Sequence, residues 1–246
     1  MKDFQSRNQR FEQQQDWQQQ PGAWGSYGME TAARASVEER MGFIRKVYAL
    51  FFAATLFAIG GVLMGLSFTP LLRFAFEHPF IMLFVMLGGV WGAQAVRHVR
   101  GLNLLALFVF TTLTGVVISP LIAVISQINP GSIFAAGVLT VGIFGGLTAY
   151  VFVSKKDFSF MRGMVTTGLI VVILAGVLNI FLGSGALGFA VAAATLLLFS
   201  GFVLYDTSNI IRRYPTNEYV AGALSLYLDA FNIFLALLRI LNAGRR

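Results

Sequence analysis

The feature that most constrains this chain is a stretch of 54 residues, 101–154, that contains no Asp, Glu, Lys, Arg or His. About 20 residues of helix already cross the ~30 Å hydrocarbon core of a bilayer, so this stretch is too long for one span. Only 12% of the 246 residues are charged, against roughly 25% in soluble domains. The sequence therefore predicts an integral membrane protein and argues against a soluble enzyme.

Breaks in the apolar pattern divide the chain into spans. Asn129-Pro130-Gly131 interrupts the long uncharged stretch, and Gly183-Ser184-Gly185-Ala186 divides a later one. Each apolar segment is expected to be helical, because an open sheet edge in lipid leaves backbone groups unpaired. The prediction is an all-α membrane protein with seven transmembrane helices, at residues 47–66, 79–96, 102–125, 132–153, 164–182, 187–211 and 219–241.

The amino-terminal part differs in composition from the rest. Residues 1–40 form a polar, Gln-rich head, which we expect to be disordered because it has too little apolar surface to offset ordering. A cleaved signal peptide is not expected, since no apolar core directly follows a basic start. Ser36 and Glu39 match a capping box and predict a short lead-in helix. The transmembrane domain is expected over residues 41–246.

The distribution of basic residues predicts the orientation. With seven spans, 14 of the 18 Lys and Arg residues fall on the side of the amino-terminal head, and cytoplasmic loops carry the excess of basic residues. The amino terminus is therefore expected in the cytoplasm. The carboxyl terminus then lies outside, unless the last segment is re-entrant and returns Arg245 and Arg246 to the cytoplasm.

Several chemistries are disfavoured by composition. The net charge of +7 is scattered in short groups between apolar runs, so no basic patch for nucleic acid is expected. The chain has no cysteine, which excludes disulfides and thiolate metal sites. His78 and His98 fall in short predicted loops and are expected to be plain interfacial residues. No cofactor is expected. Small-residue pairs predict close helix contacts at Gly61/Gly65, Gly88/Gly92 and Gly142/Gly146.

Two carboxyl groups interrupt the last two spans. Asp229 lies about 15 Å into the membrane when counted from Tyr219 at ~1.5 Å per residue, and Asp206 lies about 9–10 Å inside its helix end. A charge at such depth costs about 2.5–3.5 kcal/mol on insertion scales, so it should face the bundle interior and have a partner. Consecutive helices are expected to be antiparallel, which puts the two aspartates at similar depth.

Polar neighbours strengthen the case for a site. Asn209 shares a helical face with Asp206, and Ser225 and Asn232 share one with Asp229. Two carboxyl groups in one low-dielectric site do not readily both ionise, so the pair can share a proton or be discharged by a cation. Hard cations, Ca²⁺ above all, take such oxygen ligands. Arg97, at the end of the second predicted helix, is either a counter-ion for this pair or a topology charge.

These residues resemble a known family. The segment at residues 224–241, LSLYLDAFNIFLALLRIL, resembles the last-helix signature of the Bax inhibitor-1 family of multi-pass membrane proteins. Similar motifs stand at the same relative places over residues 40–246. They are Arg45-Lys46-Val47-Tyr48, Phe110-Thr111-Thr112-Leu113-Thr114-Gly115, Tyr205-Asp206-Thr207 and Lys155-Lys156-Asp157-Phe158-Ser159. The last of these motifs by itself indicates only a solvated cytoplasmic turn.

The resemblance implies a bundle in which the last helix is wrapped by the other six. It also implies a pH-sensitive calcium leak in which Asp206 and Asp229 form the proton-sensing dyad, with Arg97 in the place of an arginine that latches it. Ca²⁺ is then the transported ion. The protein lies in a lipid bilayer, which we expect to be a bacterial inner (cell) membrane. The residues do not indicate whether low or high pH opens the leak.

Two other functions stay open. A non-transporting regulator would bind other membrane proteins, such as a protease or cell-death factors, and would need the aspartates only for packing. An intramembrane aspartyl protease would use the two carboxyl groups to activate water. However, Leu226-Tyr227-Leu228 precedes Asp229 where that class has Gly-x-Gly. We therefore expect a protein that is not an enzyme.

Overall fold

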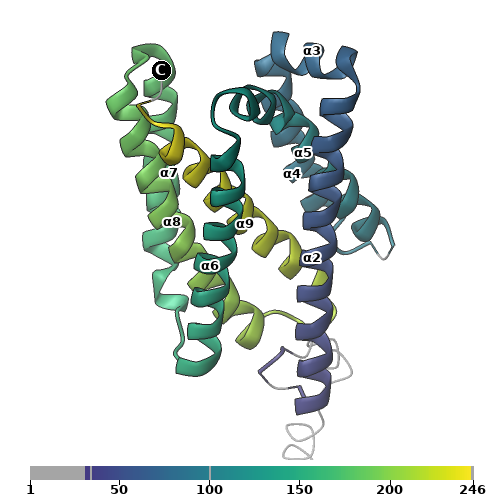
Figure 1. Cartoon of the computed structure of the whole chain (residues 1–246). Coiled ribbons are helices and arrows are strands. Elements are labelled where there is room, and N and C mark those ends of the chain that lie inside the picture. Colours follow the sequence, from purple (N-terminus) through teal and green to yellow (C-terminus); the bar gives the residue numbers. More distant parts are fainter. Residues whose placement is uncertain (1–30, 34, 100, 245–246) are drawn as a thin grey trace, which may run out of the picture. The chain divides into compact units, whose positions relative to one another are not determined.

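The computed structural model describes residues 31–33, 35–99 and 101–244 (Figure 1). Of the head that we expected to be disordered, residues 1–40, residues 1–30 and 34 lie outside this part of the chain, and the helix α2 begins within it at Val37. The elements of the described part are helices, joined by short turns, and an isolated β-bridge pairs Thr31 with Pro215. They are α2 (Val37–Ser67), α3 (Thr69–Glu77), α4 (Pro79–Ala95), α5 (Leu102–Ile128), α6 (Pro130–Ser154), the 3₁₀ turn η1 (Ser159–Met161), α7 (Arg162–Leu182), α8 (Gly185–Arg212) and α9 (Tyr219–Asn242).

The predicted all-α membrane fold is confirmed. Six of the helices are long and apolar enough to span a membrane, and the pair α3 and α4, bent by 96°, supplies a seventh candidate. The predicted second span corresponds to α4, which has 17 residues. The helix α3 occupies a segment that we expected to be a loop. Pro79 explains the bend at His78, because proline disfavours helical geometry in the residue before it.

The start of α2 confirms the predicted lead-in helix. The Ser36 side chain accepts a hydrogen bond from the Glu39 backbone at 3.2 Å, and the Glu39 carboxylate accepts one from the Ser36 backbone at 3.1 Å. This capping box satisfies two backbone donors at the helix end. The helix then continues without a break to Ser67, so the expected first span is the later part of one long helix.

The last helix is central among the described elements, as the family resemblance implied, but four helices and not six pack closely on it. Half of the residues in its most apolar window are buried, against 44% or less in the other candidate spans. It packs mainly against α8, α2, α6 and α5, while α4 packs on α5 and α7 packs on α8. Figure 1 shows α9 running obliquely between α8 and α2. The helix that carries Asp229 is therefore surrounded by protein.

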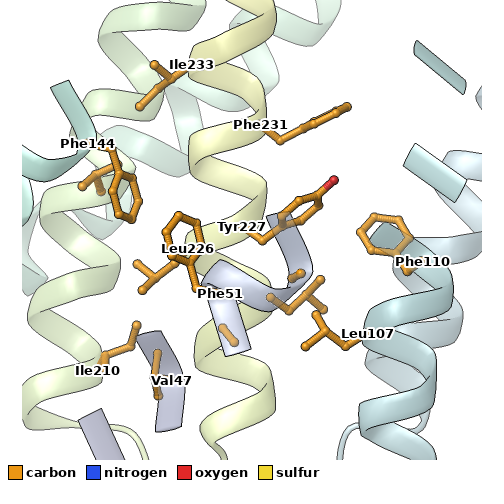
Figure 2. Close-up of a cluster of buried hydrophobic side chains, with 14 of the residues drawn as sticks. Val47, Phe51, Leu107, Phe110, Phe144, Ile210, Leu226, Tyr227, Phe231 and Ile233 are labelled. Atoms are coloured by element: carbon orange, nitrogen blue, oxygen red, sulfur yellow. The ribbon is translucent and has the colours of Figure 1, made fainter. Parts of the chain in front are cut away.

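The buried core is built around α9 (Figure 2). Leu226, Tyr227 and Ile233 of this helix are at most 3% exposed. Phe110 of α5 meets the Tyr227 ring edge to face, with 6.4 Å between the ring centroids. Aromatic pairs of this kind fix the relative position of the helices as well as burying apolar area.

Glycines allow α2 and α5 to approach closely. A Cβ atom on Gly61 would collide with the carbonyl oxygen of Thr112, and one on Gly115 with that of Ala58. The predicted helix contact at the Gly61/Gly65 pair is confirmed. The same prediction is wrong for Gly88/Gly92 and Gly142/Gly146, where an added Cβ would meet nothing within 4 Å. Small residues permit close packing but do not by themselves supply the neighbouring helix.

The turns between helices gather on two opposite faces. The start of α2 and the turns at residues 96–99, 155–158 and 213–218 form one face, here called the loop face, and are joined by contacts such as His98 to Glu218 at 3.4 Å and Arg213 to Asp157 at 3.1 Å. On the other face Asn242, at the end of α9, binds Asn129 and Ser132 at the α5–α6 turn. The helix α9 thus runs from the loop face to the opposite face.

Candidate functional site

The two aspartates predicted as a dyad lie on neighbouring helices. Asp229 stands near the middle of α9 and is 3% exposed, while Asp206 is half-buried on α8, six residues before its end. Both α8 and α9 meet the loop face at the turn that joins them, so they are antiparallel. The two helices also pack against each other. The structure therefore places the predicted pair on adjacent, antiparallel helices.

Asp229 is the exceptional member of this pair. Its Oδ2 atom is buried and has no hydrogen-bond partner in the described part of the chain. A buried carboxylate without a partner is costly, because the protein does not replace the water that it has lost. The group must therefore hold a proton, bind a cation or water, or gain a partner by a rearrangement.

The polar residues predicted beside the aspartates form other contacts. Ser225 is hydrogen-bonded to the Tyr214 hydroxyl at 3.2 Å, and the Asn232 side chain donates to the Leu228 carbonyl of its own helix at 2.8 Å. The Asn209 carbonyl accepts from the Tyr214 backbone at 3.0 Å. The Ser225 side chain thus contacts Tyr214 instead of a carboxyl group, whereas the contact between Asn209 and Tyr214 joins backbone atoms.

Tyr214 is the site residue that the sequence did not reveal. It lies in the turn between α8 and α9, and burial together with the charge of Asp206 raises its pKa to about 12. The phenol is therefore neutral near pH 7 and can donate a hydrogen bond. Tyr214 directly follows two arginines, and it belongs to no helical repeat because it lies in a turn. The sequence pattern therefore did not predict its place at the site.

Arg97 lies close to the site without contacting the carboxyl groups. Its side chain is exposed and donates to the His98 ring at 2.8 Å. Within the described residues, Asp206 and Asp229 have no basic group at salt-bridge distance. However, Arg97 lines a pocket of about 330 Å³ whose wall includes Tyr205 and Asn209, which flank Asp206 on α8. The latch role of Arg97 stays a prediction.

A buried group of hydroxyls adjoins Asp206 and was also missed. The side chains of Tyr48 on α2, Thr148 on α6 and Thr207 on α8 interact, but their oxygens do not reach hydrogen-bond geometry and have no other partner among the described residues. Tyr48 belongs to one of the motifs that resemble the family. The side of α8 next to Asp206 therefore contains unsatisfied polar atoms.

The segment Lys155-Lys156-Asp157-Phe158-Ser159 is more than a solvated turn. The Phe158 backbone donates to the Ser208 hydroxyl at 3.0 Å, and Arg213 donates to Asp157 and to Ser159 at 3.1 and 2.6 Å. The backbone N–H of Ser159, with Arg213 in support, lowers the pKa of Asp157 to about 2. This turn anchors the end of α8 that carries Asp206.

The fold defines a multi-pass helical membrane protein that carries an aspartate on each of its last two helices. The chain belongs to the Bax inhibitor family, since residues 40–246 match the family described as Inhibitor of apoptosis-promoting Bax1. This assignment confirms the resemblance of its motifs.

Relatives occur in animals, bacteria and viruses. Protein lifeguard 4 of Mus musculus is 35% identical over 89% of this chain and 91% of its own length. An uncharacterized membrane protein of Vibrio cholerae is 44% identical over 55% of this chain and 61% of its own length. The Golgi anti-apoptotic protein of Vaccinia virus is 32% identical over 90% of this chain and 93% of its own length.

Proposed function

We propose that this protein is a pH-sensitive leak for cations, with Ca²⁺ as the transported ion, in a bacterial inner (cell) membrane and with a cytoplasmic amino terminus. The observation that supports this function is the buried Oδ2 atom of Asp229, which lacks a partner in the described residues and lies on a helix packed against the one that carries Asp206. A carboxyl pair in the interior of a membrane bundle is expected to serve a proton or ion pathway.

The proposed mechanism uses competition for the negative charge of the dyad. At low pH Asp206 and Asp229 share a proton and carry less negative charge to attract a cation. As pH rises the proton leaves, and the exposed charge attracts Ca²⁺ through its carboxylate oxygens. Arg97 competes with the ion for the same charge, so the relative strength of these two partners decides whether high pH opens or closes the leak.

The test is Ca²⁺ entry into dye-loaded liposomes that contain the purified full chain, across about pH 5.5 to 8. The proposal predicts flux above that of empty liposomes, with a pH dependence that Asp229→Asn and Asp206→Asn abolish. Asp157→Asn is the matched control, because this carboxylate lies outside the spans and already pairs with Arg213. Absence of flux from correctly inserted protein at every pH would exclude the leak.

The relatives' names favour a second function, that of a regulator without transport. The family description names inhibition of Bax1, and a viral relative is called anti-apoptotic. Such a regulator would bind membrane-protein partners, and Asp229 would serve packing alone. It predicts that Asp229→Asn lowers the thermal stability of the protein in detergent while liposomes show no flux for either form.

We also propose that the protein is not an enzyme. The sequence before Asp229 departs from the aspartyl-protease pattern, and its Oδ2 atom is enclosed in the described structure instead of facing a substrate cleft. Incubation of the protein with unfolded membrane substrates should produce no cleavage that depends on Asp206 or Asp229.

A further inference from the structure

The polar pocket on the loop face gathers basic side chains from separate elements. Arg97 follows α4, Arg162 begins α7 and Arg213 follows α8, and all three line the pocket of about 330 Å³. Its other lining residues are Ser159, Tyr205, Asn209, Tyr214, Pro215 and a single acidic residue, Glu218. The pocket is thus predominantly basic.

Two of the three guanidinium groups that line the pocket are not paired with a carboxylate. Arg213 pairs with Asp157 at 3.1 Å, and Glu218 pairs with His98 at 3.4 Å. Arg97 donates a hydrogen bond to the Nε2 atom of His98. Within the described residues, neither Arg97 nor Arg162 has a carboxylate at salt-bridge distance. Two guanidinium groups in the pocket are therefore available to an anion.

The first turn of α7 adds to the positive potential. Arg162 is the first residue of this 21-residue helix, and its N–H donates to the Ser159 carbonyl of the preceding 3₁₀ turn, while Met161 provides no side-chain cap for the N–H groups that follow. The first backbone N–H groups of a helix lack internal partners and carry the positive end of its dipole, which favours phosphate and other anions. The helix start and the guanidinium groups thus act in the same direction.

The position of the pocket indicates which anion it meets. It lies on the face where α4, α5, α6, α7, α8 and α9 start or end, which is the level of the lipid headgroups for a spanning bundle. Phe160 and Met164, beside the lining residues Ser159 and Arg162, are 79% and 62% exposed. Such exposed apolar side chains are suited to contact with acyl chains next to a headgroup.

We propose that this pocket binds the phosphate group of an anionic phospholipid. Guanidinium groups bind phosphate oxygens through paired, charge-assisted hydrogen bonds, and basic pockets between transmembrane helices accept lipid headgroups. One consequence rests on the proposed leak: a bound headgroup would compete with Asp206 for Arg97 and reduce the positive charge at the cation entrance. The binding itself does not depend on that function.

The test measures binding of a fluorescent phosphatidylglycerol analogue to the full chain in detergent micelles, with phosphatidylcholine, which is zwitterionic and has no net charge, as the comparison. We expect a preference for phosphatidylglycerol and a roughly tenfold loss of affinity in Arg162→Gln, because a charge-assisted contact is removed. Arg97→Gln should also weaken binding, and it supplies a second variant if Arg162→Gln unfolds. The control is Arg45→Gln. Arg45 is exposed near the start of α2, which lies on the loop face, and it does not line the pocket.

Three outcomes would overturn the proposal. One is equal affinity for the two lipids, and another is an equal loss of affinity in Arg45→Gln, which would show general attraction to a basic face. The third concerns the source of the phosphate. If inorganic phosphate displaced the analogue as well as unlabelled phosphatidylglycerol did at the same concentration, the site would bind free anions. Loss of binding in these assays is separate from any change in Ca²⁺ flux, so failure of the leak would not remove the site.

Discussion

The hydroxyl groups of Thr114 on α5 and Tyr227 on α9 are hydrogen-bonded to each other inside the bundle. Tyr227 lies two residues before Asp229, and its ring also stacks with Phe231 at 5.8 Å. The contact therefore joins the central helix to α5 close to the level of the dyad. It gives Thr114, within one of the motifs that resemble the family, a structural role.

Removal of this contact should destabilise the bundle. Tyr227→Phe leaves the Thr114 hydroxyl without its interhelical partner, and we expect a loss of about 1 kcal/mol in unfolding free energy. Tyr48→Phe is the matched control, because the Tyr48 hydroxyl is buried without hydrogen-bond geometry to any described residue. Its removal should be neutral or stabilising. Thermal unfolding in detergent compares the two variants, and an equal loss in both would contradict this assignment.

The α2–α5 interface should not tolerate a methyl group at its glycines. Gly61→Ala and Gly115→Ala each place a Cβ against backbone atoms, and such overpacking costs about 1–3 kcal/mol. Gly88→Ala and Gly142→Ala add the same methyl where no atom lies within 4 Å, so they should be neutral or slightly stabilising in a helix. Midpoints of thermal unfolding that fall equally in all four variants would contradict this prediction, because the loss could then not be due to the close contact between α2 and α5.

The anchor at Asp157 should be insensitive to pH in the range proposed for the leak. Its pKa is lowered from 3.8 to about 2, so its stabilising effect is present above pH 3.8 and is lost as the pH falls toward 2. Hydrogen exchange of the Phe158 amide, corrected for intrinsic rates, should therefore be constant from about pH 8 to 5.5. A midpoint of Ca²⁺ flux that moves in Asp157→Asn would assign the pH response to this turn instead of the dyad.

The parts of the structure that follow from local chemistry could be predicted. Uncharged runs gave the spans, and the Ser36 and Glu39 pair gave the start of α2. Asp229 could be predicted as a buried residue of special role, because a lone carboxyl group in an apolar helix is expected to face the interior of the bundle. The family resemblance correctly implied the central position of the last helix.

The remaining features depend on which turns meet in space. Tyr214, the basic pocket and the attachment of Asp157 to Arg213 join segments far apart in the chain, and no sequence period encodes them. The small-residue pair at Gly142/Gly146 shows the same limit. Its spacing permits a close neighbour, but only the arrangement of the helices determines whether one is present.

The central claim is that a proton held by Asp206 and Asp229 controls cation flux. It is tested most directly by recording Ca²⁺ entry and the infrared absorption of protonated carboxyl groups in the same proteoliposomes, across about pH 5.5 to 8. The account predicts that both signals change with one midpoint and that Asp229→Asn removes the pH dependence of both. Flux that varies with pH while the carboxyl absorption attributable to Asp229 stays constant would contradict it.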